Sequence, residues 1–201
     1  QFRPDLPYLG ILQALSGLLR RELAEPQAQY EARCAALREA VGTNGRLLTD
    51  VMPELVGLIG QQPEVETVPP RDAERRLHLL VGRFLAVFAE PGRPVVMFLD
   101  DLQWADPPSM LLLEALAADP GLNHLMVIAG YRSTEVGPGH PLHAVLAALR
   151  GAARETVEIA LEPLKPPDMR RLLADTLNVE PQQVEALGDH VHRISGGNPF
   201  A

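Results

Sequence analysis

The sequence has few of the residues on which several common kinds of protein depend. Of its 201 residues only Cys34 is a cysteine, so an internal disulfide and a cysteine-rich metal site are both excluded. Aromatic residues make up 4%, which leaves the packing to Leu, Ala, Val and Ile. No apolar run approaches the roughly 18–20 residues that cross a membrane, and no stretch is typical of a secretory signal peptide. We therefore expect a cytoplasmic protein that does not act at a membrane.

Positive charge is also scarce. The formal net charge is −8, which counts against broad attraction to nucleic acid or to an anionic membrane. A single nucleotide is still compatible with this charge, because a local site can oppose the overall sign. The length suits one large domain, or one domain with a small appendage.

A short apolar run that ends in two carboxylates is the strongest pattern in the chain. Val95–Leu99 is apolar throughout and is followed directly by Asp100 and Asp101. The run predicts a parallel strand that is buried on both faces and carries the two charges at its carboxyl end. Ligands of open α/β sheets bind at that edge.

Mg²⁺ is commonly held by one or two carboxylates, waters and substrate phosphates. The pattern predicts a nucleotide-phosphate site in which Asp100 faces Mg²⁺ and Asp101 polarises the attacking water. Alternatively, the pair only ends a strand.

Strands and helices alternate around this stretch. Residues 125–130 are a second buried apolar run, and residues 155–161 alternate as a third strand would. Helical spacing, caps and stops predict helices over 7–23, 26–41, 46–52, 54–59, 71–89, 107–118, 142–149, 166–177 and 182–194. This order predicts an α/β protein with a parallel sheet: a helical segment over 1–70, the sheet core over 71–165, and a helical segment over 166–201. Asp106, directly before Pro107, is expected to cap the helix over 107–118. The helix over 71–89 is expected to carry one apolar stripe: Leu77, Leu80, Val81, Phe84, Leu85 and Phe88.

Two further sites have both a functional and a structural interpretation. Arg132 follows the second strand and is expected at the height of the aspartates, where its guanidinium could reach the same phosphate. Alternatively, it pairs with Glu135. The run from Gly196 to Pro199 is, by local geometry, an ordinary helix stop. Trp104, the only tryptophan, is expected to be a packing anchor under the aspartate turn.

Several of these motifs together resemble a known family. The residues are Phe98-Leu99-Asp100-Asp101-Leu102-Gln103-Trp104-Ala105-Asp106, then Gly130-Tyr131-Arg132 with Glu135-Val136 and His140-Pro141-Leu142, then Gly197-Asn198-Pro199-Phe200. They resemble the AAA-like ATPase module of STAND-type signalling proteins, which are P-loop NTPases. The nearest resemblance is to bacterial multidomain proteins that carry this module between a Ser/Thr protein-kinase domain and GAF and histidine-kinase domains.

The resemblance implies a fold, cofactors and residue roles. The fold would be a partial P-loop NTPase of the AAA/STAND type, a parallel three-layer sandwich in which residues 1–201 are the C-terminal portion of one ATPase domain. The cofactors would be ATP and Mg²⁺. Asp100 would be the Mg²⁺-side carboxylate of the Walker B strand, Asp101 the water-activating residue and Arg132 the sensor 1 residue. Gly197, Asn198 and Pro199 would form the Gly-x-Pro turn beside the adenine.

One family motif is missing from these residues. The P-loop, Gly-x-x-x-x-Gly-Lys-Ser/Thr, would cradle the phosphates, but the only lysine, Lys165, lies in a different context. The chain begins without Met and ends just after a Gly-Gly-Asn turn, so we expect it to be a piece of a longer protein. We expect the P-loop strand and the family's second strand to precede Gln1, which would leave a gap beside the strand at 125–130. The 201 residues alone would then bind ATP poorly and lack activity.

The sequence thus predicts part of a regulatory ATPase module. In the full-length protein, ATP binding and Mg²⁺-dependent hydrolysis would switch a signal-transduction kinase or a transcriptional regulator. The partners would be the nucleotide and other domains of the same polypeptide, with no nucleic acid and no membrane. Two alternatives remain: an interaction or scaffold module that does not hydrolyse ATP, and a different Mg²⁺-dependent phosphotransferase that uses the aspartate pair.

Overall fold

The structure is a computed structural model that describes residues 7–22, 26–66, 68–151 and 155–200. The chain divides into two compact units, residues 1–156 and residues 157–201. Each unit is described by itself. None of the helices in the described ranges combines the length and the apolar character needed to cross a membrane.

The first unit is built around a parallel pair of strands. β1 (Val95–Leu99) pairs with β2 (Leu125–Ala129) in a register that places Val95 opposite Leu125 and Leu99 opposite Ala129. Parallel strands need a long crossover, and α6 (Pro107–Ala118) supplies it. Both strands lie where the apolar runs of the sequence predict them.

Helices make up most of the rest of this unit. They are α1 (Leu9–Glu22), α2 (Gln27–Val41), α3 (Gly45–Val51), α4 (Val56–Ile59), α5 (Pro70–Phe88) and α7 (Leu142–Gly151), with 3₁₀ turns at Gly42–Asn44, Pro53–Leu55 and Leu102–Trp104. The apolar stripe predicted on α5 is confirmed, because Leu80, Val81, Phe84, Leu85 and Phe88 are all buried. The helices predicted over 7–23, 26–41 and 46–52 are observed as α1, α2 and α3, and the one over 54–59 is observed as a 3₁₀ turn followed by α4.

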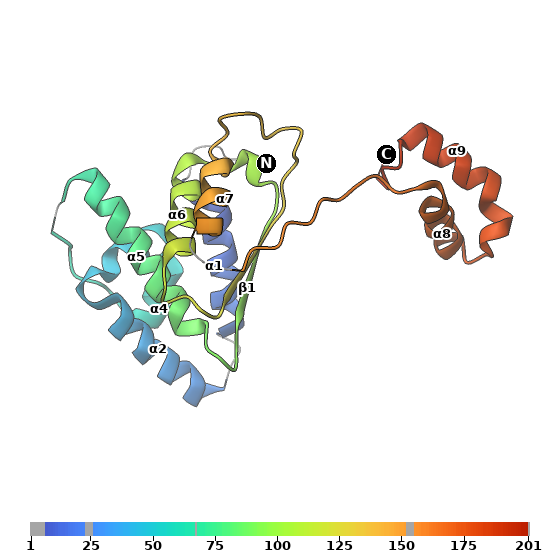
Figure 1. The fold of residues 1–201 in the computed structure, drawn as a ribbon. Helices are drawn as coiled ribbons and strands as arrows, with labels where there is room; N and C mark the ends of the chain where they lie inside the picture. Colours follow the sequence, from blue (N-terminus) through green and yellow to red (C-terminus); the bar gives the residue numbers. More distant parts are fainter. Residues whose placement is uncertain (1–6, 23–25, 67, 152–154, 201) are drawn as a thin grey trace. The chain divides into compact units, whose positions relative to one another are not determined.

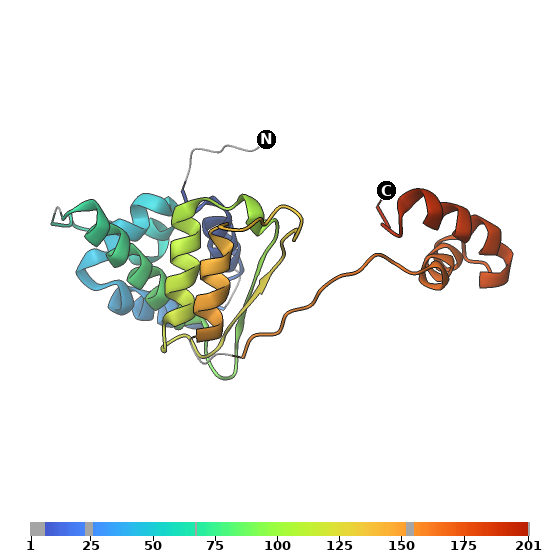
Figure 2. The ribbon, with the colours of Figure 1, turned by 45° about the horizontal axis from the view of Figure 1, so that its top comes forward.

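The sheet of the first unit is covered on one face. Both views place α6 and α7 side by side on one side of the strands (Figure 1 and Figure 2). Met97 and Leu99 are buried, whereas the alternate residues Val96 and Phe98 are 58% and 62% exposed. The prediction that β1 is buried on both faces is therefore wrong for the described residues. The expected three-layer sandwich is not confirmed, since the described residues of this unit cover only one face of the strands.

The predicted third strand does not form. Residues 155–161, all of which the structure describes, carry no β-strand, and Val157, Ile159 and Leu161 are 74%, 77% and 93% exposed. Alternating residues stabilise a strand only where a neighbouring strand pairs with it and one face is covered. Among the described residues the sheet contains β1 and β2 alone, so residues 155–161 are not part of it.

The second unit is a helical hairpin. α8 (Pro166–Leu177) and α9 (Glu185–Ser195) are joined through a 3₁₀ turn at Pro181–Val184, and both are drawn at the red end of the colour scale in Figure 1. Arg170 on α8 bonds to Asp189 at 2.8 Å and to Glu185 at 2.9 Å. The apolar side chains buried in this unit are few and small in total volume: Met169, Ala174 and Val184.

Candidate functional site

The two aspartates lie at the carboxyl end of β1, where the chain turns sharply. Asp101 has a left-handed backbone (φ 53°), which is uncommon for a residue with a side chain. The Asp100 carboxylate accepts a hydrogen bond from the Asp101 N–H (2.9 Å). Backbone bonds from Gly130 N–H to Leu99 and from Leu102 N–H to Gly130 (2.8 and 2.9 Å) attach the turn to the end of β2. The predicted strand end is thus confirmed.

A glycine at the end of β2 makes room for Asp100. A Cβ added to Gly130 would lie 2.6 Å from Asp100 Oδ1, closer than non-bonded atoms approach. The carboxylate therefore lies directly against the backbone of the neighbouring strand end. Gly130 was part of the sequence pattern, but its role as the space for a carboxylate follows only from the structure.

The structure brings Arg132 to the same edge of the sheet. Its Nε lies 3.9 Å from Asp101 Oδ1, and its Nη1 donates to Glu135 at 3.2 Å. The guanidinium also stacks over the Trp104 ring, 5.6 Å from the ring centroid. Arg132 therefore lies beside the aspartates, as expected from its place after β2, and it pairs with Glu135, as the structural interpretation predicts. Its contact with a phosphate stays a prediction.

Trp104 does not occupy the buried position that the sequence suggested. It is 53% exposed and presents its ring to Arg132. A large aromatic residue next to two charges can serve as a stacking surface for a guanidinium instead of a core anchor. The expectation that Trp104 packs under the aspartate turn is thus wrong.

Gln103 connects the aspartate turn with the end of β2. The sequence alone predicts no role for this residue. Its side chain is 7% exposed. Its amide Nε2 donates to Asp101 Oδ1 (2.9 Å), and its Oε1 accepts from the Arg132 N–H (3.2 Å). Its backbone oxygen is 3.1 Å from Nε2 of His140. A glutamine after an Asp-Leu pair is ordinary at a surface, so nothing in the sequence reveals this burial.

A second polar cluster supports the helix that follows the site. Asp106 caps α6 by accepting from the Ser109 N–H (2.8 Å), as predicted, and also accepts from the Tyr8 N–H (3.4 Å). The Tyr8 hydroxyl lies 3.4 Å from both Glu74 and His78. Burial, with the nearby Glu74 carboxylate, raises the pKa of Tyr8 to about 12. Burial lowers the pKa of His78, against the opposing effect of Glu74.

The predicted adenine-side residues belong to the second unit. Gly196 ends α9 in the left-handed region (φ 60°), so the helix-stop interpretation is confirmed. Gly197 continues with φ 84°, and its carbonyl accepts from the Leu164 N–H (2.9 Å). Asn198 Oδ1 accepts from the Phe200 N–H (3.0 Å), which closes a turn with Pro199 at its centre. This turn is thus well formed within its own unit.

The chemistry of the aspartate pair fits a hard divalent cation. Carboxylate oxygens are preferred ligands of Mg²⁺, which takes one or two of them and completes its shell with waters and phosphates. Asp100 and Asp101 are adjacent at an accessible strand end, with 43% of the Asp101 side chain exposed. No group of three or more His, Cys, Asp or Glu side chains suited to a metal occurs in the described ranges, so a cage built by the protein alone is not present there.

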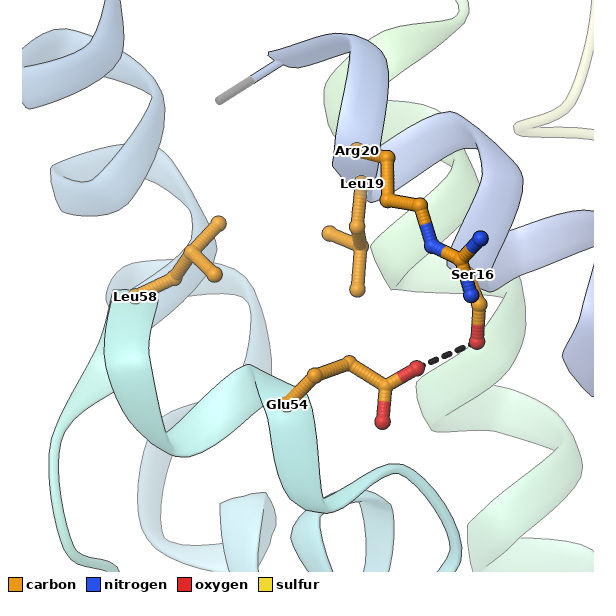
Figure 3. A pocket seen from close by; sticks show the side chains of 5 residues that line it. All are labelled: Ser16, Leu19, Arg20, Glu54 and Leu58. Carbon is orange, nitrogen blue, oxygen red and sulfur yellow. Dashed lines mark hydrogen bonds between the residues drawn. The ribbon is translucent and has the colours of Figure 1, made fainter. Parts of the chain in front are cut away.

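A shallow pocket lies elsewhere in the first unit. It has a volume of about 280 Å³ between α1 on one side and the Pro53–Leu55 turn and α4 on the other, and its lining contains none of the predicted site residues. Figure 3 shows Leu19 and Leu58 facing each other across it, with the Ser16 hydroxyl donating to Glu54. This lining offers one arginine, Arg20, and no pair of carboxylates like that at the end of β1.

The comparisons with known proteins match a large part of the chain. The family model of the AAA ATPase domain matches residues 1–128, which include both aspartates but end before Arg132. A Dictyostelium discoideum protein, the hybrid signal transduction histidine kinase G, is 37% identical over 110 residues, which are 55% of this chain and 3% of that protein. The chain thus spans a small fraction of this curated relative. No solved structure matches. On the family match over most of its length, the chain belongs to the AAA ATPase domain family.

Proposed function

We propose that the chain is the hydrolytic half of an ATP-binding regulatory module. The observation that carries this proposal is the meeting of Asp100, Asp101 and Arg132 at the carboxyl ends of two adjacent parallel strands. Two carboxylates for a cation and for a water, with a guanidinium beside them, suit phosphoryl transfer to water. Membership of the AAA ATPase domain family supports the same chemistry.

Each residue of this edge has a distinct proposed role. Asp100, held against Gly130, is the carboxylate on the Mg²⁺ side. Bound Mg²⁺ would neutralise charge on the phosphates. Asp101 orients the attacking water and accepts its proton. Arg132 leaves the acidic side chains to contact the terminal phosphate, which offers it a stronger bidentate partner than an exposed carboxylate does.

Two further segments are proposed to contact the nucleotide. Gly197, Asn198 and Pro199 form the turn beside the adenine, as the resemblance to STAND-type modules implies. The phosphates are gripped by a P-loop that these 201 residues do not contain. We propose that another segment of the full-length protein supplies this loop. Residues 1–201 alone then bind ATP weakly.

The biological role follows from the kind of protein in which a related segment occurs. The Dictyostelium relative is by name a hybrid signal transduction histidine kinase. We propose that nucleotide binding and slow hydrolysis change the population of two conformations of this module, and so gate a kinase or another regulatory domain of the same polypeptide. This role places the module in the cytoplasm, with nucleotide and neighbouring domains as its partners. The STAND-type architecture and a bacterial source remain predictions from the sequence.

One observation favours the alternative, an interaction module without turnover. The open face of the sheet presents Val96, Phe98, Met126 and Ile128, each at least 42% exposed. Contiguous apolar residues on a surface are typical of a contact with another protein segment. In this alternative the aspartate pair no longer hydrolyses ATP, and the module acts through its shape alone.

Substitution of one aspartate in the full-length protein separates the two functions. Asp101→Asn keeps the size of the side chain but removes the carboxylate that accepts the proton. We expect ATP hydrolysis to fall by about 10²-fold or more, while ATP binding measured by calorimetry is retained. The control is Asp50→Asn, which changes an exposed carboxylate paired with Arg46 on α3. Equal turnover in Asp101→Asn and wild type would remove Asp101 from the mechanism and favour the interaction module.

A further inference from the structure

We infer that Gln103 is the positioning residue that holds Asp101 and the Arg132 backbone together as one unit. The inference rests on the proposed ATPase function and deepens it. Within the described ranges, Gln103 is one of three buried polar residues, the others being Thr49 and Ser109. Burial of an amide is costly unless its donor and acceptor groups are both paired. In Gln103 both ends are paired, and both partners belong to the proposed site.

The two hydrogen bonds of the Gln103 side chain can form together only with its amide group in one orientation. The NH₂ end meets the Asp101 carboxylate, which can only accept, and the oxygen meets the Arg132 N–H, which can only donate. Leucine offers neither partner. Glutamate has nearly the same shape, but when ionised it would place a second carboxylate about 3 Å from that of Asp101, where like charges repel. The site therefore discriminates an amide from its closest replacements.

The position of Gln103 in the chain couples the two strand ends. It lies two residues after Asp101, while Arg132 follows the neighbouring strand, so the amide spans from β1 to β2. The Asp101 carboxylate is otherwise approached by the Arg132 guanidinium at 3.9 Å, which is too long for a hydrogen bond. The hydrogen bond from the Gln103 amide, at 2.9 Å, is thus the short contact that fixes the position of Asp101 Oδ1. A shift of β2 would be transmitted to Asp101 through it.

The test uses turnover and nucleotide binding in the full-length protein. Gln103 touches neither water nor nucleotide in this scheme, so Gln103→Leu should lower kcat by about tenfold to a hundredfold and leave the Kd for ATP within about twofold. Gln103→Glu is the second variant, chosen because it keeps the side-chain shape if the leucine variant fails to fold. It should lower kcat similarly. A kcat within twofold of wild type in a folded Gln103→Glu variant would overturn the inference.

Two controls distinguish positioning from general loss of structure. Gln27 makes the same kind of bond at an exposed site, donating to Glu31 at 2.7 Å, so Gln27→Glu is the matched control and should leave kcat unchanged. If Gln103 acts through Asp101, adding Gln103→Leu to Asp101→Asn should lower kcat by less than twofold further. A full additional tenfold loss in the double variant would show that Gln103 acts by another route.

The fluorescence of Trp104, the only tryptophan, gives a readout independent of turnover. The Arg132 guanidinium lies over its ring, so release of the Arg132 backbone should change the emission of the nucleotide-free protein in Gln103→Leu but not in Gln27→Glu. An unchanged emission in a folded Gln103→Leu variant would contradict the inference. If Asp101→Asn leaves turnover intact, the ATPase proposal fails. If only the Gln103 variants leave it intact, the positioning role alone fails.

Discussion

The turn at Gly197 should be far more sensitive to a methyl group than the glycine just before it. Gly197 has φ 84°, and a Cβ there would lie 2.4 Å from the carbonyl oxygen of Leu164 and 2.9 Å from Cβ of Pro163. The Leu164 oxygen is fixed by a contact with Nε2 of His192 at 2.9 Å. Gly196 has φ 60° and open space around the same position. The two alanine variants therefore share the backbone strain and differ in the clash.

The magnitudes can be worked out from these contacts. A left-handed conformation costs an alanine about 1–2 kcal/mol, which applies to both variants. In Gly197→Ala the overlap with Leu164 adds about 1–3 kcal/mol. Loss of the Leu164–Gly197 hydrogen bond adds about 1 kcal/mol. The totals are about 3–6 kcal/mol for Gly197→Ala and about 1–2 kcal/mol for Gly196→Ala. A 45-residue unit is expected to have a free energy of unfolding of about 2–7 kcal/mol, so Gly197→Ala should remove a large part or all of it.

Amide hydrogen exchange measures this opening residue by residue. Protection of the α8 and α9 amides should fall by about a hundredfold or more in Gly197→Ala and by about tenfold in Gly196→Ala. The amides of α6, in the first unit, serve as the internal reference and should not change. Equal losses in the two variants, or full protection in Gly197→Ala, would refute the argument from the Leu164 contact.

Three further predictions concern the first unit, each followed by chemical denaturation. Phe84→Ala should lower the free energy of unfolding by about 3–5 kcal/mol, because the ring is fully buried. Leu79→Ala, at a position 54% exposed on the same helix, should change it by no more than about 0.5 kcal/mol. Equal effects of the two variants would contradict the assigned buried face of α5. Asp106→Ala should cost about 1–2 kcal/mol through loss of the cap on Ser109, and an unchanged midpoint would count against the cap. Because the pKa of Tyr8 is raised to about 12, folding favours its protonated form. The contribution of Tyr8 to the free energy of unfolding is therefore fully present below its ordinary pKa of 10.0 and is lost as the pH rises toward 12. Tyr8→Phe should therefore flatten the alkaline loss of stability, and a slope equal to that of wild type would refute the assignment.

Local sequence patterns are sufficient to predict those helices and strands whose formation depends on their own residues and on the burial of one face. The α5 stripe, both strands and the Asp106 cap follow from apolar spacing and from a carboxylate before Pro107, and all are observed. The segment at 155–161 has the pattern of a strand, but pairing depends on a neighbour that its own residues cannot specify.

The sequence predicts the charged residues of the candidate site, but it does not predict the hydrogen bonds and stacking contacts that join them. Asp100, Asp101 and Arg132 could be placed at one edge because parallel strands end together. The roles of Gln103 and Trp104 depend on which side of a turn each side chain takes after Asp101 adopts a left-handed backbone. Residue type alone misleads there, since the glutamine is buried and the tryptophan is half exposed.

The most direct test of the central claim is the Mg²⁺ dependence of ATP binding by the full-length protein. Calorimetric titrations with ATP in Mg²⁺ and in EDTA should give tighter binding with the metal for wild type. In Asp100→Asn that difference should disappear while metal-free binding stays the same, because Asp100 is the proposed ligand on the Mg²⁺ side. The same Mg²⁺ dependence in both proteins, or no ATP binding by the full-length wild type, would contradict the account.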